Sequence, residues 1–147
     1  MKMKTYFFDT SVLIAAIIEK HPNHEKAFYR LNEAVRGNIG FIVSTHTLAE
    51  LFSVLTGMPS SPKISPSQAK FLIEKNTGSA KIIEINSKDY HNVISLLAEL
   101  NLSGGIIYDA LSVYTAGKAK ADYILTFNEN DFKKFEIKGD FPKIISP

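Results

Sequence analysis

Residues 5–18 read TYFFDTSVLIAAII, and this stretch decides how the chain begins to fold. Thr5 to Phe8 is a short apolar run typical of a buried strand, and Ser11 to Glu19 has the character of a helix that follows it. Asp9, at the junction, is the only charged residue in the stretch. The sequence therefore predicts a strand, a carboxylate at its carboxyl end, and a helix.

The same alternation of short apolar strands and helical periodicity continues along the chain. Further strands are expected at 41–43, 81–84, 123–125 and 143–145. Helices are expected from near Pro22-Asn23, from about 45 to 56, from 66 to about 76, from Ser87 through Leu100, and from 106 to about 118. This order is typical of an α/β sandwich around a mostly parallel sheet.

Local signals predict where several of these helices begin and end. Ser65 to Gln68 has the pattern of a capping box with Pro66 at the first helical position. Ser87 is expected to cap the helix that follows it, and Gly37 suits the carboxyl end of the second helix.

The 147 residues are about the size of a single domain, and we expect one domain spanning 1–147. A composition of 45% apolar and 22% charged residues excludes a disordered chain, a collagen-like fibre and a long coiled coil. No apolar run approaches the roughly 20 residues that cross a bilayer, and neither a signal peptide nor membrane association is expected. Cysteine is absent, which excludes disulfides and thiolate–zinc sites. A cytoplasmic location fits these properties, and the net charge of +2 is mildly compatible with a polyanionic partner.

Charged residues are almost absent from three segments. These segments are 5–18, 47–58 and 106–117, and each contains one charge. At 22% charged residues, segments of this combined length would hold about eight charges, and the three present are all acids: Asp9, Glu50 and Asp109. A carboxylate among apolar residues is disfavoured unless something pairs with it, and no Lys or Arg lies in these segments. The partners must be either backbone N–H groups at helix starts or a bound cation.

The positions of these acids favour a shared site. Asp9 follows the first strand, Glu50 lies in the helix after the second, and Asp109 lies near the start of its own helix. Functional groups of α/β sheets gather at the carboxyl ends of the strands, so the three carboxylates are expected to converge at one edge. Converging carboxylates repel one another, and Mg²⁺ or Mn²⁺ is the usual counterion.

Each acid also has a purely structural interpretation. Asp9 could cap the helix after it, Thr47 to Glu50 matches a capping box, and Asp109 could complement the dipole of its helix. The joint pattern favours the shared site, because three independent caps would not require every neighbouring charge to be absent.

A fourth element follows the strand at 123–125. Residues 125–132, LTFNENDF, offer a hydroxyl, two amides and two carboxylates at the end of a strand. From local sequence alone, a polar turn that opens a short helix is the favoured interpretation.

Four pieces of the chain, taken in order, resemble the PIN-domain family and, within it, the VapC-type ribonuclease toxins. They are DTSVL at 9–13, LAEL at 48–51, GIIYDAL at 105–111, and LTFN to DF over 125–132. The resemblance covers the whole chain and implies a three-layer α/β/α sandwich with a mostly parallel central sheet. It also implies a Mg²⁺-dependent endoribonuclease, with Mn²⁺ as an alternative ion, that hydrolyses RNA phosphodiester bonds.

By this resemblance, Asp9, Glu50 and Asp109 correspond to an acidic triad that would hold the metal and take part in catalysis. The fourth acidic position is less direct, because many relatives have an Asp where this chain has Asn128. Others have an acid three residues after that Asn, which here is Asp131. We therefore expect Asp131 as the fourth catalytic acid, with Asn128 orienting water or metal.

Ser11 and Thr126 are expected to support these acids through hydrogen bonds. The histidines lie outside the family's motifs, and none is needed as a base: His21, His24, His46 and His91. Basic residues could hold the RNA backbone at the rim of an acidic site, although a solvated surface is the favoured interpretation for the four candidates: Lys118, Lys120, Lys133 and Lys134.

The resemblance further implies an RNA substrate, a role as the toxin of a type II toxin–antitoxin pair, a cognate antitoxin protein, and a homodimer with an apolar face formed partly by the early helices. Phe28, Leu31 and Val35 are equally consistent with a core and with such an interface. Two alternatives stay open, namely a PIN-like module that binds RNA or protein without cleavage, and a free-standing RNA-processing nuclease. Haloacid-dehalogenase and receiver-like domains are disfavoured, because Asp9 lacks the second nearby acid that each requires.

Overall fold

Five parallel strands form a single central sheet in the computed structural model, which describes residues 2–136 and 142–147. The strands are β1 (Thr5–Phe8), β2 (Gly40–Ser44), β3 (Lys81–Ile83), β4 (Tyr123–Leu125) and β5 (Lys143–Ile145). Their order across the sheet is β3-β2-β1-β4-β5, and all four neighbouring pairs are parallel. The expected mostly parallel sheet is therefore confirmed, and every described pairing is parallel.

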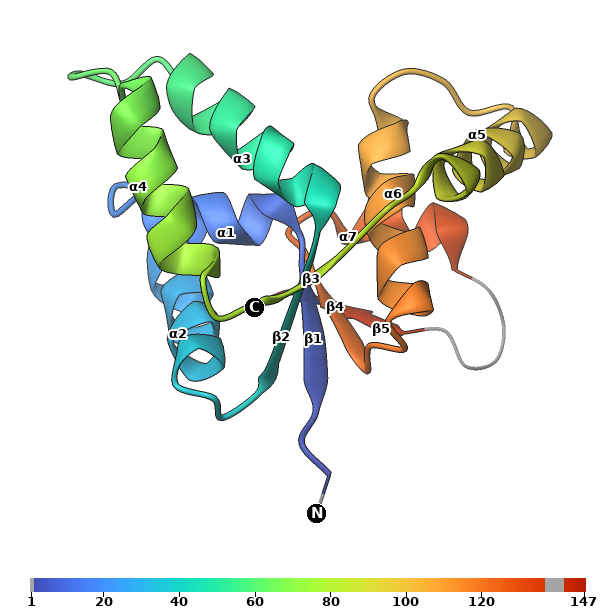
Figure 1. Ribbon diagram of the computed structural model, residues 1–147, viewed down its shortest axis with the longest axis horizontal. Coiled ribbons are helices and arrows are strands. Elements are labelled where there is room, and N and C mark those ends of the chain that lie inside the picture. The colour runs from blue at the N-terminus through green and yellow to red at the C-terminus, as the bar shows by residue number, and fades with distance from the viewer. Residues whose placement is uncertain (1, 137–141) are drawn as a thin grey trace.

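Helices cover both faces of the sheet, so the three-layer α/β/α architecture is confirmed (Figure 1). Helices α1 to α4 lie on one side and α5 to α7 on the other. The helices are α1 (Thr10–Ile17), α2 (His24–Val35), α3 (Thr45–Gly57), α4 (Pro66–Thr77), α5 (Ser87–Leu100), α6 (Ile106–Lys118) and α7 (Glu129–Phe132), followed by a 3₁₀ turn at Lys133–Phe135.

Two separate apolar cores follow from the alternation of side chains along the strands. Phe8, Val43 and Leu125 point into the core beneath α1 to α4, whereas Phe7 and Ile124 point into the core beneath α5 to α7. Strands buried on both faces lose the alternation of polar and apolar residues. This is why β1 reads as a continuous apolar run in the sequence.

The predicted helix boundaries are mostly confirmed, with one shift at α5. Ser65 and Gln68 form the expected reciprocal capping box at α4. At α5 the capping residue is Asn86 and not Ser87, because the Asn86 side chain accepts a hydrogen bond from the backbone N–H of Asp89, and the Asp89 carboxylate accepts one from Asn86 N–H. The prediction for Ser87 was therefore wrong by one residue.

The strand order creates a topological switch point beside β1. The chain moves from β1 to β2 and β3 in one direction, then crosses to place β4 and β5 on the other side of β1. The crevice at such a switch point, outside the carboxyl ends of the strands, is where open α/β sheets bind ligands. Asp9 and Thr126 follow β1 and β4 at this position. Within 2–136 and 142–147, no helix has the length and apolar character needed to cross a membrane.

Candidate active site

Asp9 is the most tightly held acid of the site. Its backbone N–H donates to Leu125 O at 3.0 Å, and its carboxylate Oδ2 accepts hydrogen bonds from Ser11 Oγ at 2.7 Å and Thr126 Oγ1 at 2.9 Å. The residue is 5% exposed. It occupies the position before α1, but its side chain makes no capping bond there. The carboxylate therefore faces the β1–β4 junction, and the capping interpretation is wrong.

The two hydroxyls that hold Asp9 are themselves fixed by the loop after β4. Ser11 Oγ accepts the backbone N–H of Phe127 at 3.3 Å, and Thr126 Oγ1 accepts that of Asn128 at 2.9 Å. Each hydroxyl is thus left to donate its proton to Asp9. Asn128 contributes through its backbone, and its side chain makes no capping bond to α7.

Burial raises the pKa of Asp9 above its usual range, because desolvation disfavours the charged form. The hydrogen bonds from Ser11 and Thr126 oppose this rise, and the negative charge of Glu50 adds to it. No described cation contributes to its shift.

Asp109 also has a strongly raised pKa. It lies in the first turn of α6, as the dipole interpretation requires. Yet its pKa is raised to about 7, first by desolvation and then by the charges of Asp9, Asp131 and Glu50, in that order. The four predicted acids therefore act on one electrostatic site, and a favourable helix dipole does not offset their mutual repulsion.

Glu50 lies on α3, in the helical layer on the opposite side of the sheet from Asp109 and Asp131. The capping box of α3 consists of Ser44 and Thr47, so Glu50 has no capping role and the Thr47–Glu50 interpretation is wrong. Its Oε1 atom is buried and has no hydrogen-bond donor within the part of the chain that the structure describes. His46 Nε2 lies 3.1 Å from it, but outside hydrogen-bond geometry.

His46 is a site residue that sequence reasoning missed. It is 7% exposed, and its ring lies between Ser44 Oγ, 2.7 Å from Nδ1, and Ser112 Oγ, 3.3 Å from Nε2. Ser44 Oγ also accepts the His46 backbone N–H at 3.4 Å. Of the two ring nitrogens, Nε2 is the one that faces Glu50. The spacing of four residues on one helix was the available signal.

Asp131 lies on α7 and is more exposed than Asp9 and Glu50. Its Oδ1 is 3.1 Å from Lys134 Nζ, and both side chains are about half exposed. Its charge nevertheless raises the pKa of Asp109, while Lys134 lowers it. Asp131 therefore lies near the edge of the acidic site, with a neighbouring cation of its own.

Three of the four candidate rim lysines lie next to acids of the chain. Lys118 is not free to bind a ligand, because its Nζ lies 2.8 Å from Asp89 Oδ2 and also donates to Glu84 O. Lys133 and Lys134 remain beside the site, each near an acid of α7.

The donors present have the chemistry that suits a hard divalent cation. All four acids offer carboxylate oxygens, and the buried Glu50 Oε1 lacks a donor in the described chain. Across residues 2–136 and 142–147, no three His, Asp or Glu side chains lie together closely enough to ligate one ion as they stand. The acids fit such an ion by their chemistry, and side-chain rotation would have to bring them onto it.

Comparison with known proteins gives matches over nearly the whole chain. The PIN domain family model matches residues 6–138. The chain is 34% identical over 113 residues to Ribonuclease VapC40 of Mycobacterium tuberculosis. The aligned region spans 77% of this chain and 79% of that protein. The chain is 28% identical over 116 residues to Ribonuclease VapC27 of the same organism, spanning 78% of each.

Solved structures of similar fold include two toxin-system proteins. VapBC2 from Rickettsia felis, bound to a DNA fragment from its promoter, matches with a TM-score of 0.68 and 21% identity over 97% of this chain and 98% of that one. VapC20 of M. tuberculosis, described as a sarcin–ricin loop cleaving toxin, matches with a TM-score of 0.69 and 13% identity over 92% and 98% of the two chains. These identities support the fold alone.

Proposed function

The chain belongs to the PIN-domain family and is of its VapC type, and from this premise we propose that it is a divalent-metal-dependent endoribonuclease, the toxin of a toxin–antitoxin pair. The relatives of known name are ribonucleases. The observation that carries the proposal is the shared electrostatic site, in which burial and then the charges of three other carboxylates raise the pKa of Asp109 to about 7. We also propose that its substrate is RNA and that it acts in the cytoplasm.

Asp9, Glu50 and Asp109 are the residues that would hold the metal. A bound Mg²⁺ or Mn²⁺ would neutralise charge on the phosphoryl oxygens and lower the pKa of an attacking water. The chain's own contribution is to fix these carboxylates. Ser11 and Thr126 hold Asp9 at Oδ2, and the metal-free Asp109 carboxyl keeps a proton up to about pH 7.

Asp131 and Asn128 are proposed to act at the edge of the site. Asp131 adds negative charge next to Asp109 and is the fourth catalytic acid of the proposal. Asn128 is anchored through its backbone to Thr126, so its amide side chain is available to orient water.

The decisive test is the variant Asp9→Asn together with metal removal. Both the variant and wild-type protein in EDTA should lose RNA cleavage by about 1,000-fold or more, while the circular dichroism spectrum stays native. Excess Mn²⁺ should restore the chelated wild type and not the variant. Near-full cleavage by Asp9→Asn would sink the proposal.

Two other functions remain within the same family. A PIN-like module that binds without cutting would show RNA or protein binding with no metal-dependent cleavage. A free-standing processing nuclease would cleave RNA without a cognate antitoxin. Co-expression with a candidate antitoxin separates the latter from a toxin, because an antitoxin would restore growth and co-purify with the chain.

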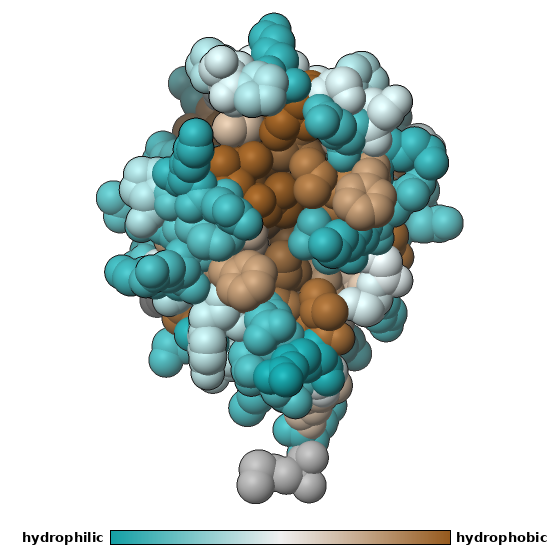
Figure 2. Space-filling model, turned by 90° about the vertical axis from the view of Figure 1, so that its left-hand side faces the viewer, coloured by the Kyte–Doolittle hydropathy of each residue, from teal (hydrophilic) through white to brown (hydrophobic). Residues whose placement is uncertain are grey.

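A homodimer is also proposed, through the face that carries α1, α2 and α4. Figure 2 shows this side, where hydrophobic residues gather around a central hollow. Of the three residues left open by the sequence, Leu31 belongs to the core, whereas Phe28 and Val35 are about half exposed.

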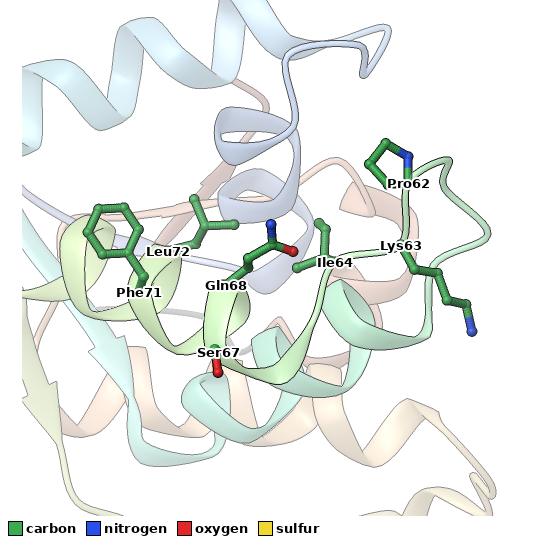
Figure 3. A pocket seen from close by; sticks show the side chains of 7 residues that line it. All are labelled: Pro62, Lys63, Ile64, Ser67, Gln68, Phe71 and Leu72. Atoms are coloured by element: carbon green, nitrogen blue, oxygen red, sulfur yellow. The ribbon is translucent and has the colours of Figure 1, made fainter.

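An apolar pocket beside α4 supports this interface. Phe71 is 62% exposed and lies with Ile64 and Leu72 in a pocket of about 500 Å³ (Figure 3). Exposed apolar surface of this kind marks association sites. The variant Phe71→Glu should shift the chain from dimer to monomer in analytical ultracentrifugation, and an unchanged mass would contradict the proposal.

A further inference from the structure

A groove lies between α3 and α6, beside the acidic site. The two helices lie in different layers and diverge above the carboxyl ends of the strands (Figure 1). The groove has a volume of about 680 Å³, within the roughly 300–1,000 Å³ typical of small-molecule pockets. Its lining consists of Thr45, His46, Ala49, Glu50, Ser53 and Val54 from α3, Tyr90 from α5, and Ile107, Tyr108 and Leu111 from α6.

The two walls of the groove differ in a way that suits a flat ligand. On α3, Thr45, Ala49 and Ser53 are small and recur every four residues, so they form one line along the helix. The other walls carry the phenol rings of Tyr108 and Tyr90. Small side chains facing aromatic rings leave space for a planar group.

The aromatic side chains of the groove are exposed and free to bind a ligand. Tyr108 is 51% exposed and Tyr90 is 36% exposed, and neither phenolic hydroxyl makes a hydrogen bond among the described residues. In contrast, Tyr114, on the same helix as Tyr108, donates its hydroxyl proton to Asp89 at 2.7 Å. Tyr114 therefore has a structural role, because its hydroxyl joins α6 to α5. The Tyr108 hydroxyl makes no such bond among the described residues.

The groove is continuous with the acidic site. Glu50 belongs to both, because it lines the groove and its charge raises the pKa values of Asp9 and Asp109. Tyr108 immediately precedes Asp109 on the first turn of α6. A ligand lying in the groove would therefore have one end next to the acids.

We propose that this groove binds one unpaired base of the RNA substrate, adjacent to the phosphodiester that is cleaved. The inference rests on the proposed function and adds the residues that would contact the base next to the cut. A base has two apolar faces and a polar edge, and single-stranded bases are recognised by stacking on aromatic side chains. The faces of the base would lie against Tyr108 and against the α3 wall, and the ribose and phosphate of the same nucleotide would lie toward the acids.

RNA is favoured over a protein segment as the occupant by the position of the groove. The phosphate to be cleaved must lie at the acids, so the neighbouring nucleotide must lie within one nucleotide's reach of Glu50 and Asp109. The groove meets this requirement, because Glu50 is part of its lining. A base held there would select which phosphodiester is placed at the acids.

The test measures RNA binding in the Asp9→Asn background, so that cleavage does not interfere. The probes are fluorescein-labelled oligoribonucleotides of adenine, cytosine, guanine or uracil alone, measured by fluorescence anisotropy. Tyr108→Leu should weaken binding of at least one probe about 10-fold, as expected for one stacked base, and Tyr108→Phe should keep most of the affinity. The matched control is Tyr29→Leu, since Tyr29 is a 63% exposed tyrosine on α2.

An abasic nucleotide identifies the base as the group that is bound. Replacing one nucleotide of the best probe with an abasic residue should weaken its binding to the Asp9→Asn protein that keeps Tyr108. The same replacement should have little further effect on binding to the protein that also carries Tyr108→Leu. In the cleaving enzyme, Tyr108→Leu should raise KM more than it lowers kcat and should change the base preference at the cut. Equal losses from Tyr108→Leu and Tyr29→Leu, or additive losses with the abasic probe, would overturn the inference.

The outcomes also separate this inference from the proposed function. If wild-type protein cleaves RNA while the Tyr108 variants bind and cleave like wild type, the groove inference fails and the nuclease stands. If wild type does not cleave RNA but Tyr108→Leu still loses affinity for the probes, the nuclease proposal fails and the base site stands. Loss of antitoxin binding by Tyr108→Leu with unchanged RNA affinity would assign the groove to the protein partner and overturn the inference.

Discussion

The first and last turns of α6 lie beside two acids whose pKa values are shifted in opposite directions. Near the last turn, Asp89 of α5 accepts hydrogen bonds from Lys118 Nζ, Tyr114 Oη and the backbone N–H of Asn86, and its pKa falls to about 2. In the first turn, Asp109 lies among three other acids, and its pKa rises to about 7. The last turn of α6 thus contacts a carboxylate of α5 whose partners the chain supplies, and the first turn of α6 carries a carboxylate that lacks such partners.

The difference separates a structural acid from a functional one. Asp89 is 5% exposed and ties α5 to α6, and its partners are all supplied by the chain. Asp109 is only partly buried, yet it lacks a comparable partner in the described chain and faces like charges. Groups whose pKa is shifted by burial and by neighbouring charges cluster at functional sites. A carboxylate that the fold leaves unsatisfied is one that a ligand can satisfy.

The largest expected contrast is in RNA cleavage. Asp109→Asn should lower the cleavage rate by about 1,000-fold, because it removes a carboxylate that would hold the metal. Asp89→Asn should change the rate by about twofold or less, since Asp89 makes structural contacts. Rates of cleavage of a single-stranded RNA, measured at a temperature where both variants are folded, check this. Equal losses in the two variants would remove the distinction between the two ends of α6.

The pH dependence of metal binding should show the raised pKa of Asp109. A cation needs the deprotonated carboxylate, so Mn²⁺ affinity should fall by about tenfold for each pH unit below 7 and level off above it. Isothermal titration calorimetry between pH 5.5 and 8 would measure this. Asp89→Asn should leave the profile unchanged, because a pKa of about 2 lies outside that range. An affinity that is flat across pH 7 would contradict the assignment.

His46 tests whether the chain's own polar groups also prepare the site. His46→Leu should weaken Mn²⁺ binding by about 10-fold, since groups behind a metal-binding carboxylate typically affect affinity to this extent. His46→Gln, which can place an amide N–H near Glu50, should lose less. His91→Leu, at an exposed position on α5, is the matched control. Identical Mn²⁺ affinity in all three variants would limit His46 to a packing role.

The smallest expected effects are on stability, and they have opposite signs. Asp109→Asn should raise the free energy of unfolding of the metal-free protein by about 1 kcal/mol at pH 8, because it removes like-charge repulsion. The raised pKa means that this repulsion develops as pH rises from about 4 to 7, so the gain should vanish at pH 4.

Asp89→Asn should instead lower the melting temperature at neutral pH. The depressed pKa of Asp89 contributes stability that is present above about pH 4 and is lost as pH falls toward 2. The difference from wild type should therefore shrink over that interval. Calorimetric melting curves at several pH values measure both effects, and a stabilised Asp89→Asn variant would contradict them.

Much of the fold could be predicted from the sequence because its signals are local. Strand and helix periodicity placed all five strands, and the capping residues placed most helix starts. The Asn86 cap differed from the expected Ser87 because two adjacent polar residues can both begin a helix, and the reciprocal bond with Asp89 decided between them.

The candidate site was predicted only in part. The acids were visible because charges are absent around them, which is a property of the sequence. His46, Ser112 and Tyr108 were not visible, because their contribution depends on α3 and α6 lying on either side of the site. The ion pair of Lys118 was not visible for the same reason, as its partner Asp89 lies 29 residues earlier.

The hydroxyl of Thr126 reaches Asp9 across 117 positions of the chain, and the backbone N–H of Thr126 is held in turn by Ile145 O at 3.1 Å. A ribosome that synthesises this protein therefore releases residue 9 long before the groups that hold it. The hydrogen bond that Thr126 donates to the Asp9 carboxylate can form only after residue 126 has been synthesised, so Asp9 is held in place late in synthesis.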